Sequence, residues 1–284
     1  MHAPDEAVGV VDQMSAAHIT TGDCIAGLAA MPAGSVNLVL ADPPYNVGID
    51  YGDGARADRL PDADYIAWTR RWISEAVRVL ADDGSMWVIC GHEYAGDHQI
   101  AMRDAGLHWR NTVVWVESFG VNCRKKFSRT SRPMFYATKH PRRFTFNDEA
   151  VTVPSARQTK YGDRRAAPGG KIMDDVWPIS RVCGTFRERV EGVPTQLPLE
   201  LVTRVVRAIT RPDDLVVDPF SGSGTTGVVC VQNGRRFHGF ELREAFAAIA
   251  RQRIDSATAD SVTDAVADDP SPGCQRQREL FALQ

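Results

Sequence analysis

The chain has 284 residues, of which 43% are hydrophobic and 24% charged, and its formal net charge is −3. This composition is that of an ordinary globular protein, and no apolar run approaches the ~18 residues that a membrane span needs. A membrane protein is excluded, and so is a protein that binds polyanions over its whole surface. Residues 1–17 lack a positively charged start followed by an apolar stretch, so we expect a flexible N-terminus and a cytoplasmic protein.

The hydrophobic pattern of the first 117 residues predicts alternating strands and helices, which is typical of an α/β sheet. The expected elements are strands over residues 18–21, 35–41, 84–90 and 112–116 and helices over residues 62–80 and 94–105. Asp62 stands where the first of these helices needs a cap. The second strand runs directly into Asp42-Pro43-Pro44-Tyr45, and two prolines cannot continue a central strand, so the chain leaves the sheet there.

The same alternation returns in the C-terminal part of the chain. Helices are predicted over residues 199–210, 225–232 and 243–254, and strands over residues 215–217 and 236–240. Prolines and a Gly-Gly pair mark the segment between the two regular parts as irregular, and we interpret residues 118–192 as an insertion. Residues 256–284 are acidic and rich in small side chains, as in a disordered tail.

The six cysteines are dispersed and form no CxxC pair, so the sequence predicts neither a zinc site nor a disulfide framework. We expect reduced thiols and no bound metal. The cysteines are Cys24, Cys90, Cys123, Cys183, Cys230 and Cys274.

Positive charge is concentrated in the insertion. Residues 118–171 hold thirteen Lys or Arg and three Asp or Glu, inside a chain that is acidic elsewhere. A basic face on an acidic protein is typical of a nucleic-acid-binding surface, with a solvated loop as the plainer alternative. Aromatic residues are interleaved with the cations, and we expect several of them to pack beneath the basic surface. The residues expected to contact DNA are Arg124, Lys125, Lys126, Arg129, Arg132, Lys139, Arg142 and Arg143.

A glycine turn follows the predicted strand at residues 215–217. Residues 218–227 (DPFSGSGTTG) contain the pattern GxGxxG, and Glu241 lies about 20 residues further on, where an acid that binds ribose belongs. An acid, a proline and an aromatic residue separate the strand from the first glycine, and Asp218 would repel a pyrophosphate. A nucleoside cofactor with an amino group and no phosphate fits better. This favours S-adenosylmethionine over NAD, with a tight turn that binds no ligand as the alternative.

The Asp-Pro-Pro-Tyr turn has the residue types needed to methylate an exocyclic amine of a nucleobase. Such an amine is a poor nucleophile because its lone pair is delocalised into the ring. The Asp42 carboxylate and the Pro43 carbonyl can accept its two N–H bonds, on a backbone that the prolines make rigid. Tyr45 offers a face on which an extruded base can stack. A simple proline turn is the alternative interpretation.

The two motifs together resemble those of the amino-methylating DNA methyltransferases, in the β-class order of catalytic tetrapeptide, target-recognition segment and glycine motif. The resemblance covers roughly residues 18–255. It implies a Rossmann-like class I methyltransferase fold, with a mixed, mostly parallel sheet, helices on both faces and a permuted motif order. It also implies three functional parts: residues 18–117 carry Asp-Pro-Pro-Tyr, residues 118–192 recognise the target, and residues 193–255 bind the cofactor.

The resemblance adds residues to the predicted cofactor site. Asp23 matches the family's acid near the cofactor adenine, and Phe220 matches its packing residue beside the cofactor. Residues 194–198 (PTQLP) resemble the family's H-P-x-Q-x-P segment, with Val193 where histidine is usual. The expected catalytic residues are Asp42, Pro43, Pro44 and Tyr45. The expected cofactor-binding residues are Asp23, Asp42, Gln196, Asp218, Pro219, Phe220, Ser221, Gly222, Ser223, Gly224, Thr225 and Glu241.

In this family Asp-Pro-Pro-Tyr mostly marks methylation of adenine N6, and Ser-Pro-Pro-Tyr that of cytosine N4. Asp42 therefore favours a site-specific, base-flipping adenine-N6 methyltransferase that acts on double-stranded DNA, as in restriction–modification systems. Cytosine-N4 methylation is the first alternative, and a non-catalytic DNA-binding subunit of a modification system is the second. Similar tetrapeptides also occur in enzymes that methylate RNA or glutamine side chains, but the large basic insertion favours a duplex. Because relatives are often dimers, we also consider a homodimer.

The acidic tail ends in a short apolar motif. Gln277, Leu280 and Phe281 match the Q-x-x-L-F peptide by which bacterial DNA-handling proteins bind the replicative sliding clamp. A disordered linker with a short apolar anchor suits that use. The clamp is therefore a candidate partner, with a chance match or docking on the protein's own surface as the alternatives.

Overall fold

The structure is a computed structural model that describes residues 16–259 except residues 53, 57, 118–122 and 166. An eight-stranded sheet in the order β1-β10-β9-β2-β3-β5-β4-β8 forms its centre. Strand β5 pairs antiparallel with β3 and β4, and every other pair is parallel, so the predicted mixed sheet is confirmed. The strands are β1 (Ala17–Thr21), β2 (Val36–Ala41), β3 (Leu80–Ile89), β4 (His108–Val116), β5 (Ser131–Thr138), β8 (Val176–Pro178), β9 (Leu215–Asp218) and β10 (Arg236–Glu241).

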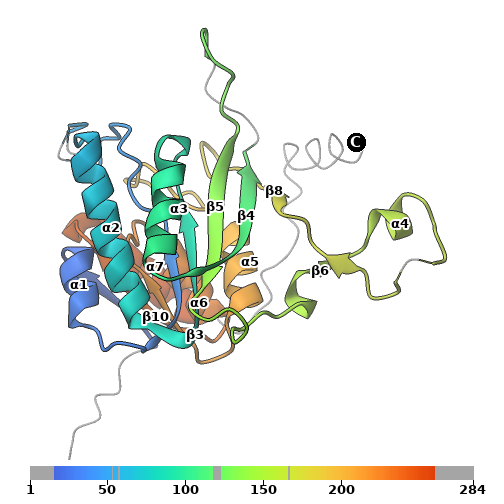
Figure 1. The fold of residues 1–284 in the computed structure, drawn as a ribbon. Coiled ribbons are helices and arrows are strands. Elements are labelled where there is room, and N and C mark those ends of the chain that lie inside the picture. The colour runs from blue at the N-terminus through green and yellow to red at the C-terminus, as the bar shows by residue number, and fades with distance from the viewer. Residues whose placement is uncertain (1–15, 53, 57, 118–122, 166, 260–284) are drawn as a thin grey trace, which may run out of the picture.

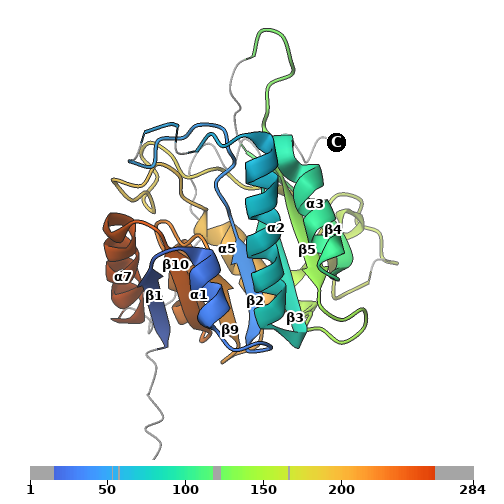
Figure 2. The same cartoon turned by 60° about the vertical axis from the view of Figure 1, so that its left-hand side comes forward.

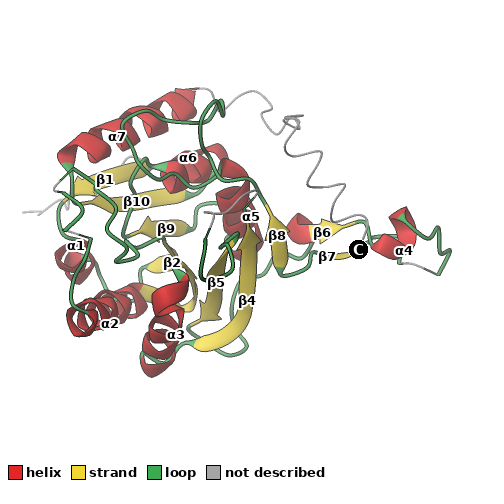
Figure 3. Cartoon of the chain, turned by 90° about the horizontal axis from the view of Figure 1, so that it is seen from above, coloured by secondary structure: helices red, strands yellow, loops and turns green. Residues whose placement is uncertain are grey.

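Helices cover both faces of the sheet, as Figure 1 and Figure 2 show. One face carries α1 (Cys24–Ala30), α2 (Asp62–Val79) and α3 (Ala95–Asp104), and the other carries α5 (Leu199–Ile209), α6 (Thr225–Gln232) and α7 (Glu244–Ala259). The view from above places the strands between these two groups (Figure 3). Among the described residues, no helix combines the length and the apolar character that crossing a membrane requires.

Strand β2 shows why the central strands read as continuous apolar runs. Leu38 and Leu40 belong to the core on the α5–α7 side, whereas Val39 and Ala41 belong to the core on the α1–α3 side. All four side chains are fully buried. Because successive side chains of a strand point to opposite faces, a strand covered on both sides has apolar residues at successive positions, as Leu38 to Ala41 have.

The parallel strands bring chemically active residues to one edge of the sheet. Strands β1, β10, β9 and β2 are consecutive neighbours and end at the same edge. Asp23 and Asp42 follow β1 and β2, and Asp218 and Glu241 are the last residues of β9 and β10. Ligands of α/β sheets bind at this carboxyl edge, so the fold alone directs attention to these four acids.

The predicted helices and strands are found within a few residues of their expected bounds, with two local differences in the α1–α3 layer. Asp62 does not cap α2, because Pro61 occupies the N-cap position, and Oδ1 of Asp62 instead accepts a 2.8 Å hydrogen bond from the Tyr94 hydroxyl. Helix α1 was not predicted. It begins at Asp23, whose carboxylate accepts a hydrogen bond from Ala26 N at 2.9 Å, and its seven residues are too few to show a helical period.

The segment 118–192 is not irregular throughout. Residues 131–138 form β5 in the middle of the main sheet, and Met134 to Ala137 are buried. Pro133 argued against a central strand, but it lies near the start of β5, and its carbonyl accepts the Cys90 N–H at 3.2 Å. Burial of an apolar run between two partner strands outweighs the local proline signal.

A small arm projects sideways from the main sheet (Figure 1). A two-stranded sheet and one helical turn form this arm. Residues 256–259, expected to begin the disordered tail, continue α7. The short elements are 3-10 helices η1 (His92–Tyr94) and η2 (Glu149–Val151), strands β6 (Thr152–Val153) and β7 (Lys171–Ile172), and helix α4 (Ala156–Thr159).

Candidate active site

A cavity of about 530 Å³ opens at the carboxyl edge of the sheet. Its size lies within the range of small-molecule sites, which is about 300–1,000 Å³. Its wall includes all four residues of the Asp-Pro-Pro-Tyr turn together with most of the glycine turn. The two predicted motifs, distant in the sequence, therefore face one shared space.

The Asp-Pro-Pro-Tyr turn is rigid and internally bonded. The Tyr45 hydroxyl donates a 2.5 Å hydrogen bond to Oδ1 of Asp42. The Tyr65 hydroxyl, from α2, donates to the Pro44 carbonyl at 2.6 Å. Both prolines have a restricted φ, so the backbone needs little further support. The turn thus presents a carboxylate and an aromatic ring to the cavity in one preset arrangement.

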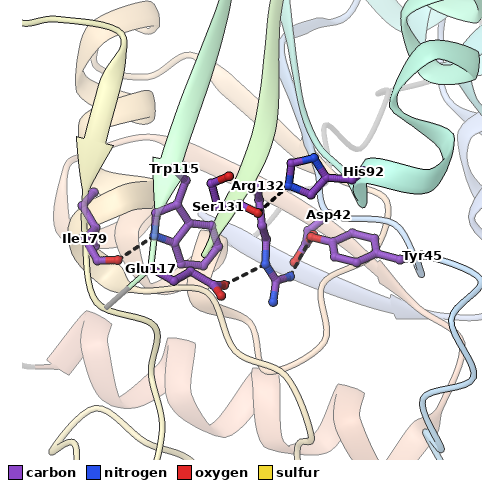
Figure 4. A network of polar contacts seen from close by, with 8 residues as sticks. All are labelled: Asp42, Tyr45, His92, Trp115, Glu117, Ser131, Arg132 and Ile179. Carbon is purple, nitrogen blue, oxygen red and sulfur yellow. Dashed lines mark hydrogen bonds and ion pairs between the residues drawn. The ribbon is translucent and has the colours of Figure 1, made fainter. Parts of the chain in front are cut away.

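Arg132 of β5 joins the turn to a second acid. Its Nη1 donates to the Tyr45 hydroxyl at 2.9 Å, and its Nε donates to Oε1 of Glu117 at 2.8 Å. Figure 4 shows the resulting chain Glu117–Arg132–Tyr45–Asp42, with Trp115 beside it. Glu117 was not expected at this site, and Arg132 was expected to contact DNA, because neither residue lies near Asp-Pro-Pro-Tyr in the sequence.

Burial shifts the pKa values of Asp42, Tyr45 and Arg132 in this hydrogen-bonded series. It raises the pKa of Asp42, and the nearby Arg132 guanidinium and the hydrogen bond from Tyr45 oppose that rise. The pKa of the Tyr45 hydroxyl is raised well above its usual value by burial and by the Asp42 charge, so this group stays a neutral donor. Burial by itself lowers the pKa of Arg132, but its acidic and hydroxyl neighbours raise it overall. Arg132 is therefore a permanent cation close to the Asp42 carboxyl group.

The glycine turn is held by Asp218. This carboxylate accepts Phe220 N at 2.9 Å and the Thr226 hydroxyl at 2.6 Å, so both of its oxygens bind the turn itself. Burial raises the pKa of Asp218 to about 7, although both hydrogen bonds oppose the shift. Asp218 lines the cavity, as predicted, but its contacts are those of a residue that shapes the turn.

Glu241 binds the same turn from the next strand. Its Oε2 accepts Gly222 N at 2.9 Å, and its Oε1 accepts Arg243 N at 3.0 Å. The Ser221 N–H donates to the Phe240 carbonyl of β10, and the Gly224 N–H donates to the Ser221 carbonyl within the turn. A ligand carboxylate could not bind these amides without displacing existing hydrogen bonds.

The first two glycines of the pattern have different surroundings. Gly222 (φ +49°) lines the cavity, whereas Gly224 (φ +77°) does not. A Cβ on Gly224 would lie 2.7 Å from Cβ of Ala250, so this glycine allows α7 to pack against the turn. Gly224 is the one predicted cofactor residue outside the wall of the cavity.

Gln196 lines the cavity, but its amide is engaged elsewhere. Its Oε1 accepts Val190 N at 2.9 Å and its Nε2 donates to the Glu188 carbonyl at 2.6 Å, so it orders the loop that closes one side. Asp23 lines the cavity, and its carboxylate also caps the N-terminus of α1. The aromatic side chains of the wall include Tyr51, Trp68, Phe220, Phe240 and Phe246, beside the aromatic turn residue Tyr45.

The charge of the cavity is acidic. Seven carboxyl side chains and four arginines line it. Such a wall favours a ligand with positive groups over a pyrophosphate, which supports the argument made from Asp218. Within the described residues no group of three or more His, Cys, Asp or Glu could hold a metal ion.

The basic residues do not form one face. Strand β5 crosses the sheet, so the cations before it lie at the cavity edge and those after it lie at the opposite edge (Figure 1). Arg124, Lys125 and Lys126 are exposed on the β4–β5 connection, beside Phe127, which is 97% exposed. Arg129 pairs with Glu93 at 2.6 Å at the rim. Lys139 donates to the Leu80 carbonyl at the far edge, and the exposed Arg142 and Arg143 follow it.

Arg132, which we expected to contact DNA, binds two side chains of the cavity wall in the structure. Its side chain is 26% exposed, and its donors bind Glu117 and Tyr45. Among the aromatic residues of the basic segment 118–171, Phe135 and Tyr136 are buried as expected, and the centre of the Phe144 ring lies 4.1 Å from the Arg110 guanidinium carbon.

Residues 277–281, proposed to bind a sliding clamp, lie outside the described residues.

Comparison with known proteins gives a consistent result. A family model described as DNA methylase, of the N6/N4 methyltransferases, matches residues 36–252. The chain is 33% identical to the DNA adenine methyltransferase YhdJ of Escherichia coli (strain K12), over 84% of this chain and 83% of that protein. It is 30% identical to the Type II methyltransferase M.HpaI of Haemophilus parainfluenzae, over 82% of this chain and 73% of the relative.

Solved structures support the fold. TTHA0409 of Thermus thermophilus, a DNA modification methylase by its description, superposes with a TM-score of 0.60 at 22% identity, over 85% of this chain and 95% of that one. The PvuII DNA methyltransferase, described as cytosine-N4-specific, superposes with a TM-score of 0.63 at 19% identity, over 94% and 93%. The predicted methyltransferase fold is confirmed.

Proposed function

This chain belongs to the N6/N4 DNA methylase family, and from that premise we propose that it transfers a methyl group from S-adenosylmethionine to adenine N6 in double-stranded DNA. The observation that carries the proposal is the shared cavity of the Asp42–Tyr45 turn and the glycine turn. One half of this cavity suits an amine, and the other suits a nucleoside cofactor. Both reactants must meet in such a space for direct methyl transfer.

The residues present fit S-adenosylmethionine. Asp23 and Glu241 are carboxylates in the cavity wall, and Phe220 adds an aromatic face. We assign Asp23 to the adenine side of the cofactor, Glu241 to its ribose hydroxyls, and Phe220 to the packing beside it. The acidic wall suits the positive sulfonium and ammonium groups. When bound, the cofactor supplies an electrophilic methyl group on sulfur.

The turn residues prepare the target amine. The Asp42 carboxylate and the Pro43 carbonyl accept the two N–H bonds, which leaves the nitrogen lone pair free to face the methyl donor. Tyr45 supplies the surface on which the flipped base stacks. The nitrogen gains a bond to the methyl carbon as the bond from that carbon to the cofactor sulfur breaks, with its electron pair left on sulfur. The nitrogen then gives up one proton, for which the ionised Asp42 is the acceptor in contact. Asp42→Ala should therefore lower turnover by about 10²–10³-fold or more, while cofactor affinity falls much less.

Two observations favour adenine over cytosine. Asp-Pro-Pro-Tyr, rather than Ser-Pro-Pro-Tyr, stands at residues 42–45, and the relative YhdJ is described as a DNA adenine methyltransferase. The likeness to the cytosine-N4-specific PvuII enzyme is at 19% identity and concerns the fold.

M.HpaI and M.ScaI are described as Type II methyltransferases, which supports a site-specific enzyme of the restriction–modification kind. An enzyme that modifies cellular DNA works where that DNA is, in keeping with the expected cytoplasmic location.

The β4–β5 connection is our candidate for the first contact with duplex DNA. It carries Arg124, Lys125 and Lys126 in exposed positions at the edge of the sheet where the cavity opens. Arg129–Glu93 and the 2.7 Å contact between His92 Nε2 and the Ser131 carbonyl tie its base to the rim. Cations on such a projection neutralise backbone phosphates without selecting a sequence.

The test is direct detection of the modified base. The chain is expressed in a bacterial host free of DNA methylation, its DNA is digested to nucleosides for mass spectrometry, and long-read sequencing gives the sequence context. We expect N6-methyladenine at one short motif and none with Asp42→Ala. N4-methylcytosine would overturn the choice of adenine. Unmodified DNA in the presence of folded protein would overturn the proposed activity.

A further inference from the structure

We propose that Arg132 is a positioning residue of the methyl-transfer site: through the Tyr45 hydroxyl it orients the tyrosine ring and keeps Asp42 in its charged, accepting form. The proposal rests on the function proposed above. It assigns a role to a residue that belongs to neither motif and that comes from a strand not expected from the sequence.

The first support is the geometry of the guanidinium. Nη1 of Arg132 donates to the Tyr45 hydroxyl at 2.9 Å, and this hydroxyl donates to Asp42 Oδ1 at 2.5 Å. A hydroxyl that accepts from a cation becomes a stronger donor, because successive hydrogen bonds polarise one another. Arg132 therefore acts on Asp42 through Tyr45, as the dashed contacts of Figure 4 show.

The second support is the way in which Arg132 itself is held. Its Nε binds Glu117, whose side chain is only 8% exposed, and its guanidinium carbon lies 5.3 Å from the centre of the Trp115 ring. Trp115 is anchored in turn by a 2.7 Å hydrogen bond from its Nε1 to the Ile179 carbonyl. Removing an ion pair from water costs free energy, so a buried ion pair contributes little net stability. The positioning role gives the Arg132–Glu117 pair a function other than stabilising the fold.

The third support is the packing of the Tyr45 ring. The Arg132 guanidinium carbon lies 5.1 Å from the centre of this ring, within the range of a cation–π contact. On the backbone side, a Cβ added to Gly91 would lie 3.2 Å from Cβ and Cγ of Tyr45. The ring is thus confined by Gly91 and Arg132, in the position where the proposed function needs a stacking surface.

The fourth support is the charge around Asp42. Besides burial, which raises the pKa of Asp42 most, Arg132 from β5 lowers it and Glu117, the residue after β4, raises it. Asp42 in turn raises the pKa of Asp218 at the end of β9 and of the Cys90 thiol after β3. Tyr45 and Tyr51, on the loop after β2, are neutral hydroxyls whose pKa values are raised by burial and by Asp42. Arg132 is the cation that offsets the acids of this group.

The test is the pH dependence of single-turnover methylation of a duplex oligonucleotide at saturating DNA and S-adenosylmethionine. In Arg132→Gln the acidic limb of the rate profile should move to higher pH by about 1–3 units, so that raising the pH restores much of the reduced rate. Arg132→Lys keeps the charge and should move the limb less. Glu117→Gln removes the opposing acid but keeps an acceptor for Arg132, and its limb should move to lower pH.

A matched control removes the same charge elsewhere. Arg70 of α2 is 51% exposed and pairs with Asp104 at 3.1 Å, so Arg70→Gln should leave the acidic limb in place. A loss of rate in Arg132→Gln that is equal at every pH would mean a structural role only and would overturn the proposal, as would a wild-type profile. If thermal unfolding shows that Arg132→Gln does not fold, the opposite limb shifts of Arg132→Lys and Glu117→Gln decide. An inactive wild-type enzyme would instead overturn the proposed function.

Discussion

The Tyr45 hydroxyl donates a 2.5 Å hydrogen bond to Oδ1 of Asp42, its neighbour three residues earlier. One oxygen of the Asp42 carboxylate is thus bound within its own tetrapeptide. In the proposed reaction an incoming amine must share this oxygen or bind Oδ2. The proposal therefore gives the tyrosine two separable functions, a face for stacking and a hydroxyl that links the carboxylate to Arg132.

Replacing Tyr45 by phenylalanine separates these two functions. Tyr45→Phe keeps the ring and removes the hydroxyl, and hydrogen bonds to charged groups contribute about 1.5–3 kcal/mol. We expect the single-turnover rate to fall by about 10–100-fold, with little change in DNA affinity. Tyr45→Ala also removes the stacking surface and should reduce both quantities. Equal rates for Tyr45→Phe and the wild type would mean that the hydroxyl has no part in the transfer step.

The division of the basic residues by β5 predicts which of them bind DNA. Charge reversal at Arg124, Lys125 and Lys126 should weaken binding to a duplex and reduce the salt dependence of the binding constant, with a slope lower by roughly 0.9 for each phosphate that is no longer neutralised. Reversal at Arg142 and Arg143, at the opposite edge, is the matched comparison and should have a much smaller effect. Affinities measured by fluorescence anisotropy over a range of salt concentrations would decide. Similar reductions at both positions would show that the duplex contacts both edges.

Asp218 should make the stability of the fold depend on pH. Burial raises its pKa to about 7 in the folded protein, so between about pH 4 and pH 7 the folded state holds a proton that the unfolded chain has released. The stability that this proton contributes is fully present below the pKa of the unfolded chain, and it is lost as the pH rises through 7. The slope is at most about 1.4 kcal/mol per pH unit.

Chemical denaturation of the wild type and of Asp218→Asn between pH 5 and pH 8 measures this effect. Asp42 and Glu241, whose pKa values burial also raises, are present in both proteins, so the difference between the two curves isolates Asp218. We expect the wild type to lose stability relative to the variant as the pH rises. Parallel curves would mean that Asp218 is ionised in the folded protein throughout this range.

The C-terminal motif gives a prediction that depends on the sequence alone. Replacing Leu280 and Phe281 by alanine should abolish capture of the chain by an immobilised bacterial sliding clamp, because the apolar anchor is removed. Methylation of short duplexes should be unchanged. Capture that persists in the double variant would exclude these residues as the binding motif.

The order of the strands and helices and the two motifs could be predicted from the sequence because both are local. A run such as residues 36–41 is apolar at every position but one because the strand is covered on both faces, and a glycine turn needs residues that tolerate positive φ. Asp42 and the glycine turn could also be placed at one edge, since the carboxyl ends of parallel strands share it. These local signals were sufficient for the fold class and for the shared edge at which the two motifs lie.

The tertiary structure decided what lies between the motifs. Pairing of β5 with β3 and β4 is a long-range event, and it outweighed the proline that marked the segment as irregular. The same pairing carries Arg132 to Tyr45, 87 residues away in the sequence, and carries Arg142 and Arg143 to the opposite edge. Charge and residue type report how a side chain can bind, but the partner that it meets depends on which strands pair. For that physical reason Arg132, a residue expected to contact phosphate, hydrogen-bonds the Tyr45 hydroxyl beside Asp42.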